Sequence, residues 1–266
     1  MQKNYNIIMK VIGNFLQTYS NRRLETANYF SQDNTLNYFL NKVDHKFFSL
    51  HNTGGDLEYC RKYANIIKQK FKDVEFFVYN EPYYTHTVCR HIKMLKEKGC
   101  TDLFFTQDDV ICSIPDKHKQ LCDVVYNFYK NSKDIDLLSL NVKGSRLIQC
   151  GIEPRQTRVV SKEHGLVAYE FITTDFAKAK YYEMDDSTYF GKISLIEKLY
   201  DEKYMTYYNT DQAEGYVRER CEKEPISRWV FNKRMFRYFY YTGMHIYNRQ
   251  KELRFIDRLL KYKVAN

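Results

Sequence analysis

The stretch Asp102-Leu103-Phe104-Phe105-Thr106-Gln107-Asp108-Asp109-Val110 decides how the rest of this sequence is interpreted. A short apolar run, typical of a buried strand, leads directly into two adjacent carboxylates. Neighbouring carboxylates repel each other unless a positive charge lies close by. A common partner is a divalent cation with oxygen ligands, which is often shared with a substrate phosphate. An ordinary polar loop would contain the same residues, because aspartate is frequent in turns.

Short apolar runs alternate with helical patterns throughout the first 110 residues. The expected strands are 7–12, 46–50, 74–79 and 103–106, and the expected helices are 21–41, 57–71 and 84–98. Strands that alternate with helices of this length predict a parallel sheet. Ligands of such sheets bind beyond the carboxyl ends of the strands.

Polar side chains follow each expected strand at that edge. They are Thr18, Tyr19, Arg22 and Arg23, then His51 and Asn52, then Asn80 and Glu81, and finally Gln107, Asp108 and Asp109. Hydroxyls, amides, a basic pair and an acidic pair suit a nucleotide diphosphate held with a metal. The sequence contains neither Gly-x-x-x-x-Gly-Lys-Ser/Thr nor Gly-x-Gly-x-x-Gly, which argues against P-loop NTPases and typical dinucleotide dehydrogenases.

The second half of the sequence predicts a mixed arrangement of strands and helices. Helices are expected over 117–131, 194–200, 213–223 and 249–262, and strands over 136–140 and 166–173. The last helix is basic and amphipathic, and we expect it to dock on the core rather than to lie on a membrane surface. No repeat, low-complexity tract or Pro/Gly linker divides the chain, so we expect one domain over 1–266.

The chain is basic, with 42 Lys and Arg against 33 Asp and Glu and a net charge of +9. This balance favours an anionic partner: nucleic acid, anionic lipid or a phosphorylated small molecule. The 25 Tyr and 18 Phe residues are typical of A/T-rich coding, since Asn, Lys and Ile are also abundant while Gly and Pro are scarce. The aromatic excess therefore does not indicate base stacking, and no nucleic-acid partner is expected.

Cysteine usage and hydropathy indicate the compartment. The seven cysteines include no Cys-x-x-Cys pair, which argues against a zinc site and a disulfide scaffold and suits a reducing compartment such as the cytoplasm. No run of 18 apolar residues predicts a transmembrane helix. The first residues also lack the apolar core of a signal peptide.

A parallel half-sheet whose fourth strand ends in an acidic pair resembles the GT-A type of glycosyltransferase. In that superfamily an Asp-x-Asp-like motif follows the strand, and its last Asp holds Mn²⁺ or Mg²⁺ against the nucleotide-sugar diphosphate. Gln107-Asp108-Asp109 stands at this position. The composition and the Thr-Gln-Asp-Asp ending are similar to small glycosyltransferase domains of large DNA viruses that build glycans for capsid proteins. The likeness covers most of the chain and is strongest over 45–112.

The resemblance implies an α/β fold of the GT-A type: a Rossmann-like, mostly parallel sheet flanked by helices, with a mixed acceptor-side half. Residues 1–112 would bind the nucleotide sugar, and 113–266 would bind the acceptor and supply a C-terminal lid. It implies a metal-dependent transfer from a nucleoside-diphosphate sugar to a glycan or glycoprotein acceptor, in the host cytoplasm if the protein is viral. Gln107 departs from the family, which usually has Asp there, and this puts the ribose contact in question.

The resemblance also assigns the metal ligands. Asp109 would bind Mn²⁺ or Mg²⁺ directly, and Asp108 would be a second ligand or contact the ribose or a metal-bound water. His245 follows Gly243 in a late loop, and several GT-A enzymes complete the metal shell with a late His. A surface or packing role for His245 is the alternative.

Further residues are candidates for binding the donor. Thr18, Arg22, Asn52, Asn80 and Gln107 lie at the expected edge, and Arg90 on the preceding helix would reach the diphosphate or the donor sugar unless it lies on a solvated face. The sequence around Trp229 has two interpretations. Its basic neighbours would form a mobile lid over phosphate, or a structural turn anchored by the tryptophan; they are Arg228, Lys233 and Arg234.

An inverting enzyme also needs a carboxylate that accepts the proton of the acceptor hydroxyl. Asp211 and Glu214 are the favoured candidates, with Asp185 and Asp186 as the competing pair. A retaining enzyme would need no base at that position. Two other functions fit the pattern: nucleotidyl transfer on a similar half-sheet, and a basic binding module for nucleic acid or glycan without turnover.

Overall fold

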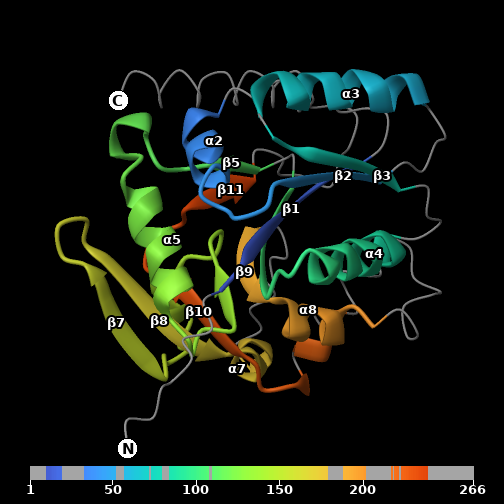
Figure 1. Cartoon of the computed structure of the whole chain (residues 1–266). Coiled ribbons are helices and arrows are strands. Elements are labelled where there is room, and N and C mark those ends of the chain that lie inside the picture. Colours follow the sequence, from blue (N-terminus) through green and yellow to red (C-terminus); the bar gives the residue numbers. More distant parts are fainter. Residues whose placement is uncertain are drawn as a thin grey trace, which may run out of the picture.

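A large mixed sheet organises the computed structural model, which describes residues 10–19, 33–51, 57–71, 73–79, 84–107, 110–178, 188–201, 217, 219–221 and 223–238. Nine strands of this part form the sheet in the order β3-β2-β1-β4-β9-β6-β10-β8-β7, and β5 and β11 form a second, small sheet (Figure 1). The strands are β1 Ile12–Tyr19, β2 Phe47–His51, β3 Glu75–Tyr79, β4 Asp102–Gln107, β5 Val110–Cys112, β6 Leu137–Ser139, β7 Gln156–Ser161, β8 Leu166–Ile172, β9 Thr188–Lys192, β10 Ser227–Phe231 and β11 Phe236–Tyr238. The helices are α2 Asn34–Leu40, α3 Leu57–Lys70, α4 Tyr84–Glu97, α5 Leu121–Asn131, α6 Gly144–Gln149, α7 Thr173–Lys178 and α8 Ile193–Leu199, with a 3₁₀ turn η1 over Asp116–His118.

The parallel half-sheet expected from the sequence is present. β3, β2, β1 and β4 are adjacent and parallel. Tyr19 is in register with His51, and His51 is in register with Tyr79. Gln107, the last residue of β4, pairs with Gln17 two positions before the end of β1. The carboxyl ends of all four strands therefore meet at one edge of the sheet.

The expected bounds of the first strand are wrong. Lys10 and Val11 precede the strand, which begins at Ile12 and continues through Gly13 to Tyr19. Gly13 lies within this strand, at a position that requires glycine for packing. A Cβ atom there would lie 2.6 Å from a methyl carbon of Leu95 and 2.9 Å from the sulfur of Cys100.

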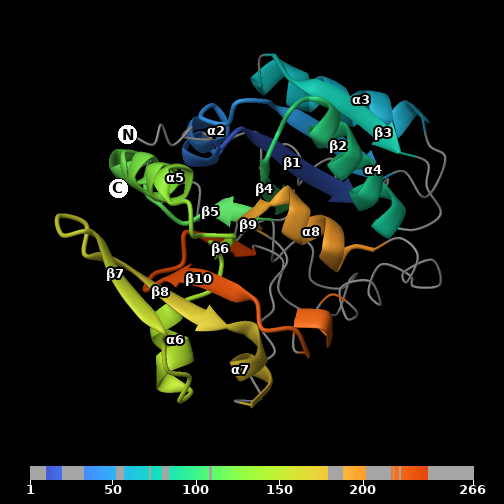
Figure 2. The same cartoon turned by 60° about the horizontal axis from the view of Figure 1, so that its bottom comes forward.

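The mixed half of the sheet contains strands that the sequence analysis did not predict. The expected strands at 136–140 and 166–173 correspond to β6 and β8, whereas β5, β7, β9, β10 and β11 were not predicted. β9 lies antiparallel between β4 and β6 and so joins the two halves into one sheet. Figure 2 shows β7, β8 and β10 at the opposite end of this sheet from β2 and β3.

Helices cover both faces of the sheet (Figure 1). On one face α2, α3 and α5 pack against β2, β4, β9 and β10, with Phe39, Phe104 and Phe190 at the centre of the cluster. On the other face α4 and α8 pack against β2, β4 and β9 around Phe105 and Tyr189. The helices expected at 57–71, 84–98 and 194–200 are confirmed as α3, α4 and α8. The helix expected at 117–131 is present as η1 and α5. The helix expected at 249–262 falls outside the described residues, as do most residues of those expected at 21–41 and 213–223.

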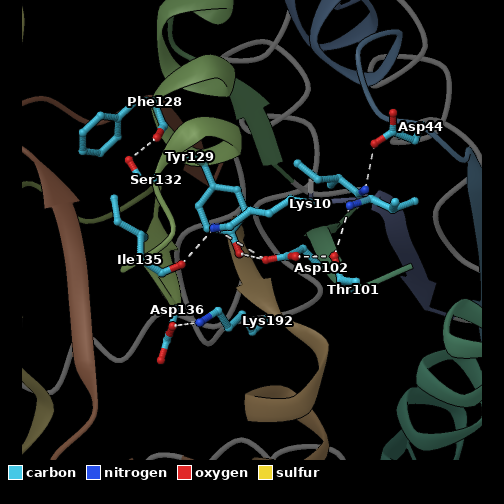
Figure 3. Close-up of polar contacts among 12 residues, drawn as sticks. Lys10, Asp44, Thr101, Asp102, Phe128, Tyr129, Ser132, Ile135, Asp136 and Lys192 are labelled. Atoms are coloured by element: carbon cyan, nitrogen blue, oxygen red, sulfur yellow. Dashed lines mark hydrogen bonds and ion pairs between the residues drawn. The ribbon is translucent and has the colours of Figure 1, made fainter. Parts of the chain in front are cut away.

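A buried polar cluster lies where β1 and β4 begin, at the edge opposite to their carboxyl ends (Figure 3). The hydroxyl of Tyr129 donates to Asp102 Oδ1 at 2.5 Å, and the hydroxyl of Thr101 donates to Asp102 Oδ2 at 2.7 Å. The Lys10 ammonium lies 3.7 Å from Asp102 Oδ1, donates to the carbonyl of Ile135 at 2.9 Å and sits 3.5 Å above the Tyr129 ring centre. The cluster thus connects α5 to the first residues of both central strands.

The pKa values of the cluster follow from its burial. Burial lowers the pKa of Lys10, while the Asp102 carboxylate partly opposes this shift. Burial, together with the adjacent charge of Asp102, raises the pKa of Tyr129 well above its ordinary value. The phenol therefore keeps its proton and donates a hydrogen bond to the carboxylate of Asp102.

We predict that Tyr129→Phe lowers the free energy of unfolding by about 2 kcal/mol, because it removes a buried hydrogen bond to a charged acceptor. Chemical denaturation followed by circular dichroism would measure the loss. Tyr126→Phe is the matched control on the same helix, since its hydroxyl accepts a bond only from the half-exposed Lys130 ammonium at 3.2 Å. An equal loss in both variants would contradict a special role for the Tyr129 hydroxyl.

The same variant has an expected pH dependence. Because the folded-state pKa of Tyr129 lies above its ordinary value of 10, its stabilising contribution is complete below pH 10 and declines as the pH rises through the folded-state value. The difference in stability between the native protein and Tyr129→Phe should therefore narrow above pH 10. A difference that stays constant to higher pH would show that the phenol is not the group responsible.

Candidate functional site

The carboxyl edge of the parallel half-sheet is the candidate site. β4 is buried along its whole length, and its last residue, Gln107, is 7% exposed. β5 begins at Val110. The two residues between these strands are Asp108 and Asp109, which lie outside the described residues. The chain thus leaves the large sheet immediately before the acidic pair and enters the small sheet immediately after it.

The small sheet relates this position to the late part of the chain. Cys112, Ile111 and Val110 pair antiparallel with Phe236, Arg237 and Tyr238. The residue after Asp109 is therefore paired with the last described residue of β11, from which seven residues lead to His245. An extended chain covers about 3.5 Å per residue, so seven residues can span up to about 25 Å.

Two buried hydroxyls lie next to the end of β4. Thr106 of β4 is in register with Thr188 of β9, and their Oγ1 atoms are 3.4 Å apart. Both residues are fully buried. This contact joins the parallel half of the sheet to the mixed half one residue before Gln107.

Arg90 lies close to the end of β3. It is exposed on α4, and its positive charge partly opposes the effect of burial, which raises the pKa of Tyr79 to about 12. Tyr79 is the last residue of β3, and its hydroxyl oxygen lies 3.5 Å from His91 Nδ1. Arg90 is therefore exposed near the end of β3, a position that fits both the donor-binding role and the alternative of a solvated helix face.

The lid hypothesis around Trp229 is wrong for its central residues. Arg228 and Trp229 belong to β10, between β6 and β8, and each is 1% exposed. Arg228 Nε donates to Ser139 Oγ at 2.7 Å. The side chain of Trp229 packs against Phe128 on the opposite face of the sheet from Arg228. The basic residues around Trp229 suggested a lid or a turn, whereas the tertiary structure buries Arg228 in the sheet.

The connection that follows β10 is also fixed by hydrogen bonds. The amides of Met235 and Phe236 donate to the carbonyl of Leu140 at 2.7 Å and 3.0 Å. Lys233 Nζ donates to the carbonyl of His164 at 2.8 Å, at the turn between β7 and β8. Neither a lid nor a turn built on Trp229 describes this segment.

The structure places only some of the predicted site residues. Gln107 and Arg90 are described, and Thr18 is placed through its backbone, which pairs with Leu50 in β2. Within the described ranges, no group of three or more His, Cys, Asp or Glu residues has a geometry that could hold a metal ion. The remaining predicted residues lie outside those ranges; they are Arg22, Asn52, Asn80, Asp108, Asp109, Asp185, Asp186, Asp211, Glu214 and His245.

Comparisons with known proteins identify the fold. The sequence matches no protein-family model and no curated protein. Among solved structures, a 4-diphosphocytidyl-2C-methyl-D-erythritol synthase from Anaerococcus prevotii superimposes with a TM-score of 0.51 at 10% identity, covering 95% of this chain and 96% of that one. A mannose-1-phosphate geranyltransferase from Thermus thermophilus gives a TM-score of 0.41 at 8% identity, covering 82% of this chain and 73% of that one.

The expected fold class is confirmed by the first of these structures. The chain has an α/β fold with a mixed sheet flanked by helices, of the GT-A or nucleotidyltransferase-like type. At 10% identity the match establishes the fold alone. Among the described helices, none has the length and apolar character needed to cross a membrane.

We predict that Arg228→Ala destabilises the fold by roughly 3 kcal/mol, because it leaves a cavity in place of a buried side chain and removes the hydrogen bond to buried Ser139. Lys233→Ala is the control and should change the stability by less than about 0.5 kcal/mol, since its ammonium contacts an exposed carbonyl. Urea denaturation would measure both. A stable Arg228→Ala variant with weakened donor binding would restore the lid hypothesis.

Proposed function

We propose that this protein is a metal-dependent glycosyltransferase, which transfers a sugar from a nucleoside-diphosphate sugar to a glycan or glycoprotein acceptor with inversion. The observation that supports this most is that the strand register brings the chain on either side of the acidic pair close to the segment that leads to His245. β4 leads into the acidic pair at the carboxyl edge of the parallel strands, and β5 leaves that pair in register with β11, seven residues before His245. Ligands of open α/β sheets bind at such an edge.

Asp108, Asp109 and His245 are the residues that would hold Mn²⁺ or Mg²⁺. Two carboxylates and an imidazole form a donor set that suits Mn²⁺ in particular, and the register of β5 with β11 allows the three residues to approach one another. A bound cation would stabilise the negative charge that develops on the departing nucleoside diphosphate.

The residues around this edge would bind the donor. Arg90, placed beside Tyr79, supplies a permanent positive charge for the diphosphate or the sugar. Gln107, buried at the end of β4, offers an amide where the family usually has a carboxylate, and we assign it to the ribose side of the donor. Thr18, Arg22, Asn52 and Asn80, at or beyond the ends of β1, β2 and β3, would complete the nucleotide contacts.

The transfer itself needs one base on the acceptor side. The acceptor hydroxyl oxygen forms a bond to the anomeric carbon, while the bond from that carbon to the diphosphate oxygen breaks and the nucleoside diphosphate leaves. The hydroxyl proton passes to a carboxylate, for which we propose Asp211 or Glu214. In this scheme residues 1–112 bind the donor and 113–266 bind the acceptor, within one domain.

Nucleotidyl transfer is the second candidate. One solved structure that matches this chain over nearly its full length is named as a synthase of a diphosphocytidyl compound. A nucleotidyltransferase would consume a nucleoside triphosphate and a sugar phosphate and release pyrophosphate. Release of a nucleoside diphosphate from a nucleotide sugar would instead support glycosyl transfer.

We predict that Asp109→Ala lowers Mn²⁺-dependent hydrolysis of the donor by roughly 100-fold or more, because it removes the proposed direct metal ligand. A panel of nucleotide sugars with Mn²⁺, assayed for released nucleoside diphosphate, would measure the effect. Thermal unfolding of the native protein with the same panel would also identify the donor, since a nucleotide sugar that binds raises the melting temperature of the protein.

Two controls make this experiment decisive. Glu163→Ala removes an exposed carboxylate in the turn between β7 and β8 and should leave turnover unchanged. Circular dichroism should show the same melting temperature for Asp109→Ala and the native protein without metal. Full activity of Asp109→Ala would remove Asp109 from the mechanism, and pyrophosphate as the product of the native protein would favour nucleotidyl transfer.

A further inference from the structure

The outer edge of β5 is bonded to a side chain rather than to a third strand. Ser113 N–H donates to the carbonyl of Met235, on the β11 side of the small sheet. Because successive residues of a strand point their amides to opposite sides, the N–H of Cys112 points away from β11. It donates to Asp33 Oδ2 at 2.8 Å.

Asp33 holds two elements with one carboxylate. Its second oxygen, Oδ1, accepts the amide of Leu36 at 3.0 Å and so caps the first turn of α2. The residue is 1% exposed. Capping alone would explain an aspartate at this position. The bond to Cys112 is an additional contact, across 79 residues of sequence.

Residues in the first turn of α2 also contact the chain that follows β5. The hydroxyl of Thr35 lies 3.1 Å from the carbonyl of Ile114 and 2.7 Å from Asp116 Oδ1, and the two acceptors share its proton. The side-chain amide of Asn34 donates to Asp116 Oδ2 at 3.2 Å. The helix terminus thus lies along the outer edge of the strand, in the place where a sheet would have another strand.

We propose that Asp33 is a positioning residue for the acidic pair of the donor site. Cys112 is the third residue after Asp109, and Gln107 is anchored on the other side of the pair by the large sheet. A carboxylate that fixes the amide of Cys112 therefore limits the positions available to Asp108 and Asp109. This inference rests on the proposed function, because it gives the acidic pair its role at the metal.

Asp33→Asn separates this role from packing, because the two side chains have nearly the same shape. An asparagine has one acceptor oxygen and one amino group. It can retain either the cap of α2 or the bond to Cys112, and the other amide then faces an amino group. The variant removes one hydrogen bond without creating a cavity.

Asp44→Asn is the matched control. Asp44 Oδ2 accepts the amide of Ile12 at 2.8 Å, at the start of β1 and therefore at the edge opposite to the donor site. The variant makes the same exchange of groups at a bond to a central strand, and it also weakens the ion pair of Asp44 with Lys130. It should lower the melting temperature without affecting β5.

Two measurements on the full chain test the proposal. Hydrogen exchange should become about tenfold faster at Val110–Cys112 in Asp33→Asn, with no change in β4. The Mn²⁺ concentration that half-saturates donor hydrolysis should rise roughly tenfold, while kcat at saturating Mn²⁺ stays close to that of the native protein. Asp44→Asn should show neither change.

The outcomes are distinguishable. Unchanged exchange at Val110–Cys112 in Asp33→Ala, which lacks both acceptor oxygens, would show that Asp33 does not hold β5 and would overturn the proposal. Faster exchange with an unchanged Mn²⁺ requirement would reduce Asp33 to a structural residue and would also overturn it. Absence of any Mn²⁺-dependent turnover in the native protein would instead refute the proposed function, and the metal-positioning role of Asp33 with it, while the exchange result would still report on β5 alone.

Discussion

The parallel pairing of β1 with β4 is the constraint on which the rest of the structure depends. This register fixes where β4 ends relative to β1, and therefore where the chain leaves the sheet before the acidic pair. The pairing is anchored at its amino end by the buried contact of Lys10 and Tyr129 with Asp102. Because a shift of one residue would separate the Lys10 ammonium from its carboxylate and move Phe104 and Phe105 to opposite faces of the sheet, the buried contacts favour a single register.

The opposite edge depends on a different kind of contact. There the large sheet stops at Gln107, and the chain continues in a two-stranded sheet that could not be stable by itself. Hydrogen bonds from both sides support it: Phe236 N–H donates to Leu140, and Cys112 N–H donates to Asp33. A buried strand before the acidic pair and a supported strand after it are the kind of preorganisation that the proposed metal and diphosphate site would require.

The two halves of the sheet differed in how well their sequences predicted them. β2, β3 and β4 and the helices α3 and α4 follow hydrophobic periodicity closely. β9 and β10 do not, since each carries a residue that suggests a loop. Gly191 is close to Ile196 of α8, and Arg228 bonds to Ser139 of β6. Only these tertiary contacts make a glycine and an arginine acceptable within buried strands.

The sequence by itself determined the parallel half-sheet, the edge at which sheets of this kind bind their ligands, and the acidic pair as the candidate metal ligands. These features are local: an apolar run, a turn and the residues that follow it are read from neighbouring positions. The tertiary structure alone decided that β9 joins the two halves, that Arg228 is a buried strand residue and that β11 lies against β5. It also revealed Asp33 as the partner of Cys112, because a hydrogen bond across 79 residues leaves no periodic pattern in the chain.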